Sequence, residues 1–249
     1  MSDWKKIDLA CEDSHADNYD SLYVNRTYFT RAEYDGFAKF TNKYAKDNMK
    51  VLDLGCGTGP LVSKIKGSIF GLDFSAALLK RANPSGVYIR GDGEYLPFRD
   101  RSFDLVYAHS FFHHFPDYEK LVSEIKRVLR SEGIVICDEP KVNALHLGWL
   151  RLYLAFLRRL HLSLYEDVSA LDSTPQTNHH GDLNPEIILG CFKRYGFMIR
   201  EIKNIFYVSY FTGVFRSRIV HNISEHVLDP LLIWIRRDSQ RVRFSAQVT

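Results

Sequence analysis

The sequence predicts an α/β protein with a doubly wound, seven-stranded and mainly parallel sheet. Between residues 51 and 138, apolar segments of strand length alternate with segments of helical spacing, which is typical of a parallel sheet with helices on both faces. The first of these strands is mostly apolar and runs into a glycine-rich turn. With 249 residues the chain is long enough for one well-buried domain, which we expect to comprise residues 1–249.

Seven segments have the composition of strands, at residues 51–54, 68–73, 87–90, 102–108, 133–138, 197–207 and 242–248. The last of them alternates apolar and polar residues, so we expect an antiparallel strand that closes the edge of the sheet, with residues 231–235 as the alternative. Helical spacing marks residues 61–66, 121–130 and 214–238, together with segments that begin near Ser75 and Asn184. Asn184 is a suitable helix cap because Pro185 follows it in the first turn.

The turn after the first strand carries glycine at every second position, as Gly55, Gly57 and Gly59. Such a turn lets the backbone come very close to a ligand, although a tight turn also needs glycine for packing alone. The second strand ends in Asp73, whose two carboxylate oxygens suit the adjacent hydroxyls of a ribose. The alternative is that Asp73 only caps the helix near Ser75. Because ligands of open α/β sheets bind at the carboxyl ends of the strands, the sequence predicts a nucleotide site there.

Five motifs in order carry a resemblance to a known family: VLDLGCGTG, GLDFS, GDGEYLPFRDRSFDLV, HHF and IKRVLRSEG. Together they resemble a class I S-adenosylmethionine-dependent methyltransferase, and within that class the group that contains the ubiquinone and menaquinone C-methyltransferases. The resemblance covers residues 45–140. It implies a Rossmann-like methyltransferase fold, S-adenosyl-L-methionine as the cofactor and no metal.

The resemblance also implies positions for the cofactor. Residues 55–57 pass under its methionine part, Asp73 holds the ribose, and Phe74 lies against the adenine. Asp92 accepts a hydrogen bond from the adenine amino group. The implied cofactor-binding residues are Tyr19, Asp53, Gly55, Cys56, Gly57, Asp73, Phe74, Asp92, Gly93 and His109.

Some of these positions bear on catalysis. Tyr19 resembles the family's amino-terminal tyrosine that closes over the site, and His109 stands where a strand-four residue flanks the sulfonium. Gly93 and His109 are less usual choices than the family's common residues. In the pair His113-His114, His114 is the candidate catalytic residue, because an imidazole can accept a proton near neutral pH. The alternative is that the pair only packs after the fourth strand.

Other histidines and the cysteines favour plainer interpretations. The pair at 179–180 lies on the rim of the acceptor pocket or in a solvated loop, and without neighbouring ligands it makes a poor metal site. The residues at 1–6 lack an apolar targeting run, which indicates a cytoplasmic protein. Scattered cysteines indicate free thiols in a reducing compartment. They are Cys11, Cys56, Cys137 and Cys191.

Charge and missing motifs exclude several substrates. The net charge of +3 gives no nucleic-acid footprint, which excludes DNA and argues against RNA. Residues 109–112 read His-Ser-Phe-Phe, whereas enzymes that methylate the amino groups of nucleobases carry an Asn or Asp, two prolines and an aromatic residue there. No Pro-Cys occurs, as a cytosine C5 enzyme would need.

We expect a helical insertion after the fifth strand, at residues 141–182. Its core at 144–165 is rich in Leu, Trp, Tyr and Phe with a narrow strip of Arg, Gly and Ala, and the arginines interrupt it too often for it to span a bilayer. Three interpretations remain open: a lid over the acceptor pocket, a dimer contact, or a basic helix at the membrane surface.

The sequence therefore predicts a cytoplasmic methyltransferase, a monomer or homodimer, that acts at oxygen or carbon of a small, apolar or amphipathic acceptor. Methyl transfer from a sulfonium needs mainly alignment and exclusion of water, so a strong cofactor site and little else is expected in the sequence. The alternatives are a tRNA- or RNA-modifying methyltransferase and a cofactor-binding regulatory subunit without turnover. The acceptor itself is not named by these residues.

Overall fold

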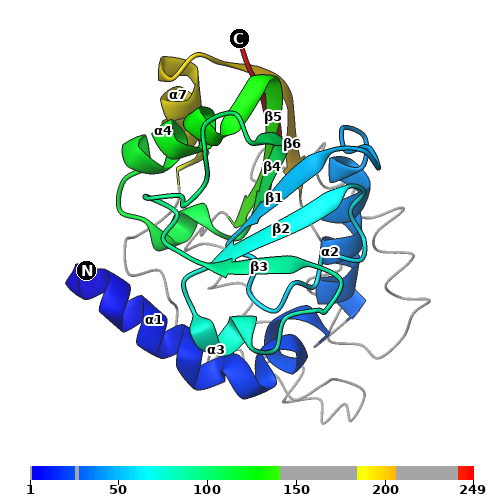
Figure 1. Ribbon diagram of the computed structural model, residues 1–249, viewed down its shortest axis with the longest axis vertical. Coiled ribbons are helices and arrows are strands. Elements are labelled where there is room, and N and C mark those ends of the chain that lie inside the picture. The colour runs from blue at the N-terminus through cyan, green and yellow to red at the C-terminus, as the bar shows by residue number, and fades with distance from the viewer. Residues whose placement is uncertain (1, 26–27, 141–183, 206–240) are drawn as a thin grey trace, which may run out of the picture.

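A computed structural model describes residues 2–25, 28–140, 184–205 and 241–249, and we restrict the account to these ranges. They form one seven-stranded sheet in the order β3-β2-β1-β4-β5-β7-β6 (Figure 1). The strands are β1 (Lys50–Leu54), β2 (Ser68–Asp73), β3 (Val87–Arg90), β4 (Phe103–His109), β5 (Leu129–Pro140), β6 (Phe197–Ile205) and β7 (Arg241–Val248). The pairs among β1 to β5 are parallel, and β7 is antiparallel to both of its neighbours. The predicted fold class is confirmed.

The position predicted for the last strand is wrong. The segment is an antiparallel strand as expected, but β7 lies between β5 and β6, and β6 forms the edge. The reason is burial on both sides of the strand. Val242 and Phe244 are buried, and so are Arg243 and Ser245, whose side chains alternate with them. Arg243 forms a buried ion pair with Asp138, and Ser245 hydrogen-bonds Tyr44, so the polar residues of this strand do not mark a solvated edge.

Helices cover both faces of the sheet. They are α1 (Asp3–His15), α2 (Tyr28–Thr41), α3 (Ala76–Leu79), α4 (Glu119–Val128) and α7 (Pro185–Arg194), with short turns η1 (Ala16–Asn18), η2 (Asp20–Val24) and η3 (Phe112–His114). Figure 1 shows α2 on one face and α4 with α7 on the other. Successive side chains of β1 therefore pack against helices on opposite faces of the sheet. Val51 packs in the cluster that contains Phe37 of α2, and Leu52 packs in the cluster that contains Ile125 of α4.

Helix predictions differ in detail from the structure. Asn184 caps α7 as expected, because its side chain accepts a hydrogen bond from the backbone N–H of Glu186. Residues 61–66 form turns and not the predicted helix, although Leu61, Val62 and Ile65 are buried. The segment lies between Pro60 and Gly67 and is too short to nucleate a stable helix. Two helices before β1, α1 and α2, were not predicted.

Several predicted segments lie outside the described residues. These are the insertion at 141–182 with its core at 144–165, the histidines at 179–180, the helix at 214–238 and the alternative strand at 231–235. Among the helices of the described ranges, none has the length and apolar character that crossing a membrane requires.

Candidate functional site

A cleft opens at the carboxyl ends of β1, β2 and β4, and residues of α1 line it. Figure 1 shows α1 beside α3. The cleft brings together residues that follow β1, β2, β3 and β4 with Tyr19 from the amino-terminal segment. The predicted site residues that line it are Tyr19, Gly55, Asp73, Phe74, Asp92, Gly93, His109 and His114. This is the end of the sheet at which the sequence placed a ligand.

The glycine loop borders the cleft through Gly55. Gly55 and Gly57 have positive φ angles of 76° and 52°, which residues with a side chain rarely adopt. A Cβ atom on Gly55 would lie 2.3 Å from Cδ2 of Phe111, so glycine is required there by packing. At Gly57 a Cβ atom would meet the ring of Tyr19 at 3.5 Å, which places that tyrosine over the loop.

Asp73 joins the end of β2 to the glycine loop. Its Oδ2 accepts a hydrogen bond from the backbone N–H of Gly57 at 2.8 Å, and its Oδ1 accepts one from that of Ser75 at 2.8 Å. The cap of α3 is Ser75 itself, whose Oγ accepts from the N–H of Leu78. Burial raises the pKa of Asp73 and the two backbone hydrogen bonds oppose that rise. Because each carboxylate oxygen has two acceptor sites, one remains on each oxygen for a ligand hydroxyl.

Asp92 meets a partner that the sequence did not predict. Its Oδ1 accepts a hydrogen bond from the backbone N–H of Glu94, while its Oδ2 lies 2.5 Å from Nζ of Lys5 on α1. Lys5 is also 2.5 Å from Oε2 of Glu94. Burial alone would lower the pKa of Lys5, but the two carboxylates outweigh it and raise the pKa.

Three predicted residues do not line the cleft. Asp53 is 3% exposed and accepts a hydrogen bond from the hydroxyl of Tyr107 at 2.8 Å, and burial raises its pKa to about 8. The buried thiol of Cys56 points toward Gly71, where a Cβ atom would meet it at 2.8 Å. Gly57 contributes backbone alone. Direct contacts of these residues with a cofactor stay predictions.

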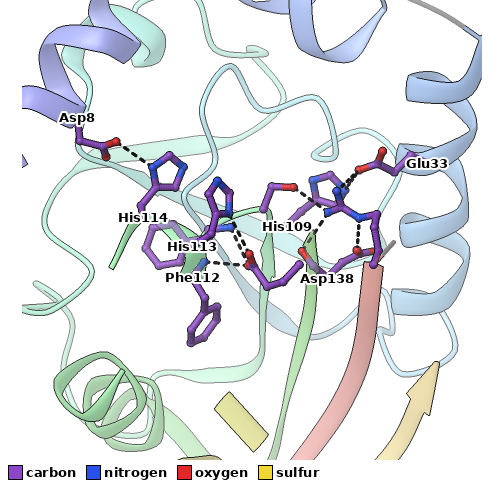
Figure 2. A network of polar contacts seen from close by, with 11 residues as sticks. Asp8, Glu33, His109, Phe112, His113, His114 and Asp138 are labelled. Carbon is purple, nitrogen blue, oxygen red and sulfur yellow. Dashed lines mark hydrogen bonds and ion pairs between the residues drawn. The ribbon is translucent and has the colours of Figure 1, made fainter. Parts of the chain in front are cut away.

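The two adjacent histidines of η3 face different carboxylates (Figure 2). Nδ1 of His113 lies 3.0 Å from Oε2 of Glu139, which is fully buried, and burial lowers the pKa of His113. Nδ1 of His114 lies 3.0 Å from Oδ1 of Asp8 on α1. Burial alone would lower the pKa of His114, but Asp8 and Glu12 outweigh it and raise the pKa.

His109 lies at the end of β4 beside a buried ionic network (Figure 2). Its Nε2 is 3.3 Å from Oε1 of Glu33, and the same Glu33 oxygen is 2.8 Å from Arg241. Arg241 and Arg243 both pair with the buried carboxylate of Asp138. Ion pairs therefore join α2, β5 and β7, and His109 of β4 lies beside them.

The contribution of α1 to the cleft was not predicted from the sequence. The residues of α1 that line the cleft are Trp4, Lys5, Asp8, Leu9 and Glu12. Their spacing follows one helical face, and this periodicity was the signal available in the sequence. Within the described ranges, no group of three or more His, Cys, Asp or Glu side chains is placed to hold a metal ion.

Comparisons with known proteins agree with this arrangement. A family model described as a methyltransferase domain matches residues 52–137. The chain is 32% identical over 148 residues to the demethylmenaquinone methyltransferase of Lactiplantibacillus plantarum, a match that covers 51% of this chain and 62% of that protein. It is 30% identical over 175 residues to the protein of the same name from Geobacillus stearothermophilus, covering 62% and 73% respectively.

A solved structure supports the fold. The phosphoethanolamine N-methyltransferase 2 of Haemonchus contortus, in complex with S-adenosyl-L-methionine, superposes with a TM-score of 0.60 at 18% identity. The match covers 95% of this chain and 57% of that one.

Proposed function

We propose that this chain transfers a methyl group from S-adenosyl-L-methionine to a small, apolar or amphipathic acceptor. The premise is that it belongs to the class I S-adenosylmethionine-dependent methyltransferases and resembles the menaquinone-methylating group. The observation that carries the proposal is Asp73, placed between the glycine loop and the cleft with an acceptor site left on each oxygen. A ribose presents two hydroxyl donors at that spacing. The described residues therefore fit the cofactor.

The other lining residues fit the remaining parts of the cofactor. The Tyr19 ring covers Gly57, so this side chain excludes water from the loop. Phe74 and Gly93 line the part of the cleft between Asp73 and Asp92, where a flat ring would lie. When bound, the cofactor supplies a methyl group activated by its sulfonium sulfur. The chain then has to align the acceptor with that methyl group and keep water out.

The named relatives support the acceptor class. Two of them are called demethylmenaquinone methyltransferases, and demethylmenaquinone is an apolar quinone. We therefore propose a quinone-like aromatic acceptor in its reduced form, methylated at carbon, with methylation at oxygen as the second outcome. The net charge of +3 supports a small molecule over RNA. A cytoplasmic location, a monomeric or dimeric state and a membrane contact through 144–165 stay predictions.

His114 keeps its sequence-based role as a candidate catalytic residue only as a prediction. It lines the cleft, and Nδ1 of its ring lies beside Oδ1 of Asp8 on α1. This contact also holds α1 against the site.

Calorimetric titration with S-adenosyl-L-methionine tests the cofactor site. Asp73→Ala is expected to weaken binding at least tenfold, about 1.4 kcal/mol, because the ribose loses its acceptor. Asp73→Asn keeps one acceptor oxygen. Its comparison with Asp73→Ala separates the loss of the ribose contact from damage to the glycine loop. Asp35→Ala on the exposed side of α2 is the matched control. If folded Asp73→Ala binds the cofactor as the wild type does, the site assignment fails.

A further inference from the structure

We infer that His109 is a catalytic residue that accepts the proton lost by the methyl acceptor, and that Glu33 is the positioning residue that holds and stabilises its imidazole. The inference rests on the proposed function and goes beyond the cofactor contact expected of His109. It is carried by the place of His109 in the cleft, by the Glu33 carboxylate beside it, and by the balance of charge around the pair.

His109 stands where an acceptor and a methyl donor would meet. Leu54 of β1 pairs with Ala108 of β4, so the next residues along the two strands, Gly55 and His109, lie side by side at the same edge of the sheet. Both line the cleft. The ring of His109 packs against Tyr34 at 4.6 Å and Phe37 at 5.0 Å between centroids, which fixes its orientation.

Glu33 faces one nitrogen of this ring, as Figure 2 shows. Nε2 of His109 is buried, and among the described residues it has no aligned hydrogen-bond partner, while Oε1 of Glu33 lies 3.3 Å away. A neutral His109 with its proton on Nε2, directed at Glu33, keeps the lone pair on Nδ1. Nδ1 is then the ring nitrogen available to the acceptor.

Glu33 is charged in this position. Burial would raise its pKa, but Arg241 at 2.8 Å and the neighbouring His109 outweigh burial and lower the pKa. A fixed carboxylate at 3.3 Å stabilises the imidazolium that forms when His109 takes up a proton. The pair therefore has the arrangement of a general base with its orienting group.

Among the described residues, the charged groups packed around the His109 ring balance each other. The charged and titratable groups packed around the ring are Glu33 and Tyr34 of α2, Asp138 of β5, and Arg241 of β7 with Arg243 behind it. Two carboxylates therefore face two guanidiniums. A neutral His109 leaves this balance intact, and the proton that it accepts is the only new charge, placed beside the nearest carboxylate.

The two other histidines near the cleft are less suited to this step. The ring of His114 is held at Asp8 on the α1 side of the cleft. His113 is held by Glu139, and it is absent from the described lining of the cleft. His109 alone of the three combines a cleft position with the Gly55 edge of the sheet.

The step balances. A hydroxyl of the reduced acceptor gives its proton to Nδ1 of His109, and the electron-rich oxygen or ring carbon forms a bond to the methyl carbon. The methyl–sulfur bond breaks, and its electron pair stays on sulfur. For methylation at carbon, the ring then loses the hydrogen of that carbon as a proton and regains the hydroxyl proton. One proton leaves per methyl group in either case.

Nuclear magnetic resonance of ¹⁵N-histidine-labelled protein tests the coupling without any acceptor. The signals of His109 are assigned by their loss in His109→Gln and followed from pH 5 to pH 9. Glu33→Gln is expected to lower the proton affinity of His109 about tenfold, because the carboxylate that favours the imidazolium is gone. Glu33→Ala, which also removes the charge, serves if Glu33→Gln does not fold, and Glu33→Asp, which keeps the charge, should retain most of the proton affinity. Glu186→Gln on α7 is the control. An unchanged titration of His109 in the variant that removes the charge overturns the inference.

Methyl transfer to a chemically reduced 2-alkyl-1,4-naphthoquinone tests the catalytic role. His109→Gln is expected to lower kcat at least 100-fold, a much larger change than any in the calorimetric Kd for S-adenosyl-L-methionine. In Glu33→Gln the acidic limb of the kcat–pH profile should move by the shift seen in the titration. A His109→Gln variant with unchanged kcat, or with equal losses in kcat and cofactor binding, overturns the inference. If the wild type binds cofactor but methylates no such probe, the acceptor class of the proposed function fails, and the titration still decides the coupling.

Discussion

Nζ of Lys5 lies 2.5 Å from Oδ2 of Asp92, so the first helix of the chain is tied to the wall of the cleft opposite to it. The family resemblance implies that Asp92 accepts a hydrogen bond from the adenine amino group, and Lys5 forms an ion pair with the same carboxylate. A cationic side chain and a ligand donor therefore compete for one oxygen, while Glu94 offers Lys5 a second carboxylate.

Removing this competitor should tighten cofactor binding. In Lys5→Met we expect the Kd for S-adenosyl-L-methionine to fall about threefold, because Oδ2 of Asp92 is released and the methionine preserves the apolar stem. Calorimetric titration measures the change. Lys6→Met is the matched control, since Lys6 pairs with the exposed Asp3. Weaker cofactor binding in Lys5→Met would show instead that the ion pair holds α1 in place beside the cleft.

Glu12 should make stability fall as pH rises toward neutrality. Burial, with Asp8 and Asp73 nearby, raises its pKa to about 7 from an ordinary value of 4.5. The folded state then holds a proton that the unfolded state loses, so the stabilisation is complete below pH 4.5 and is lost by about pH 7. Relative to the wild type, Glu12→Gln should gain up to about 3 kcal/mol between these limits.

Thermal unfolding at pH 5 and pH 8 measures this gain. Glu186→Gln, on the exposed surface of α7, is the control and should show the pH dependence of the wild type. An equal difference between Glu12→Gln and wild type at both pH values would contradict a raised pKa for Glu12.

Asp138 should be essential for the docking of β7. It is fully buried between Arg241 and Arg243, so Asp138→Asn removes the carboxylate that both guanidiniums share and leaves Arg241 paired with Glu33. We expect a loss of about 3–5 kcal/mol in the free energy of unfolding, measured in urea. Asp100→Asn, which breaks an exposed pair with Arg127, should change it little.

The same residue gives a pH dependence of opposite sign. The two guanidiniums outweigh burial and lower the pKa of Asp138 to about 2 from an ordinary value of 3.8. Its contribution is therefore present above pH 3.8 and is lost as the pH falls toward 2. The urea midpoint of Asp138→Asn should fall less steeply across this range than that of the wild type. Parallel curves would contradict the assignment.

Gly55 should tolerate no side chain. Gly55→Ala combines a φ of 76° with a Cβ atom 2.3 Å from the Phe111 ring, so we expect a loss of at least about 2 kcal/mol in stability. Gly190→Ala, within α7 and free of close contacts, should gain about 0.5–1 kcal/mol. Urea unfolding compares the two variants. An unchanged free energy of unfolding in Gly55→Ala would show that the glycine loop and Phe111 move apart at little cost.

Much of the fold was predictable because its signals are local. The strands from Val51 to Asp138 are apolar runs of the right length, and the cap at Asn184 depends on neighbouring residues only. Phe111 shows where such reasoning stops. The glycine pattern around Gly55 predicted a close approach to the backbone, and the atom that approaches it in the structure belongs to this side chain of the same protein.

By itself, the sequence determined the parallel core, the glycine loop and the carboxylate that follows the second strand, since periodicity and turn chemistry act over a few residues. Only the tertiary structure decided that β7 enters the sheet between β5 and β6, that Lys5 reaches Asp92, and that Glu33 faces His109. Each of these depends on contacts between distant segments. Their stability comes from burial and charge pairing that exist only once the whole sheet has formed.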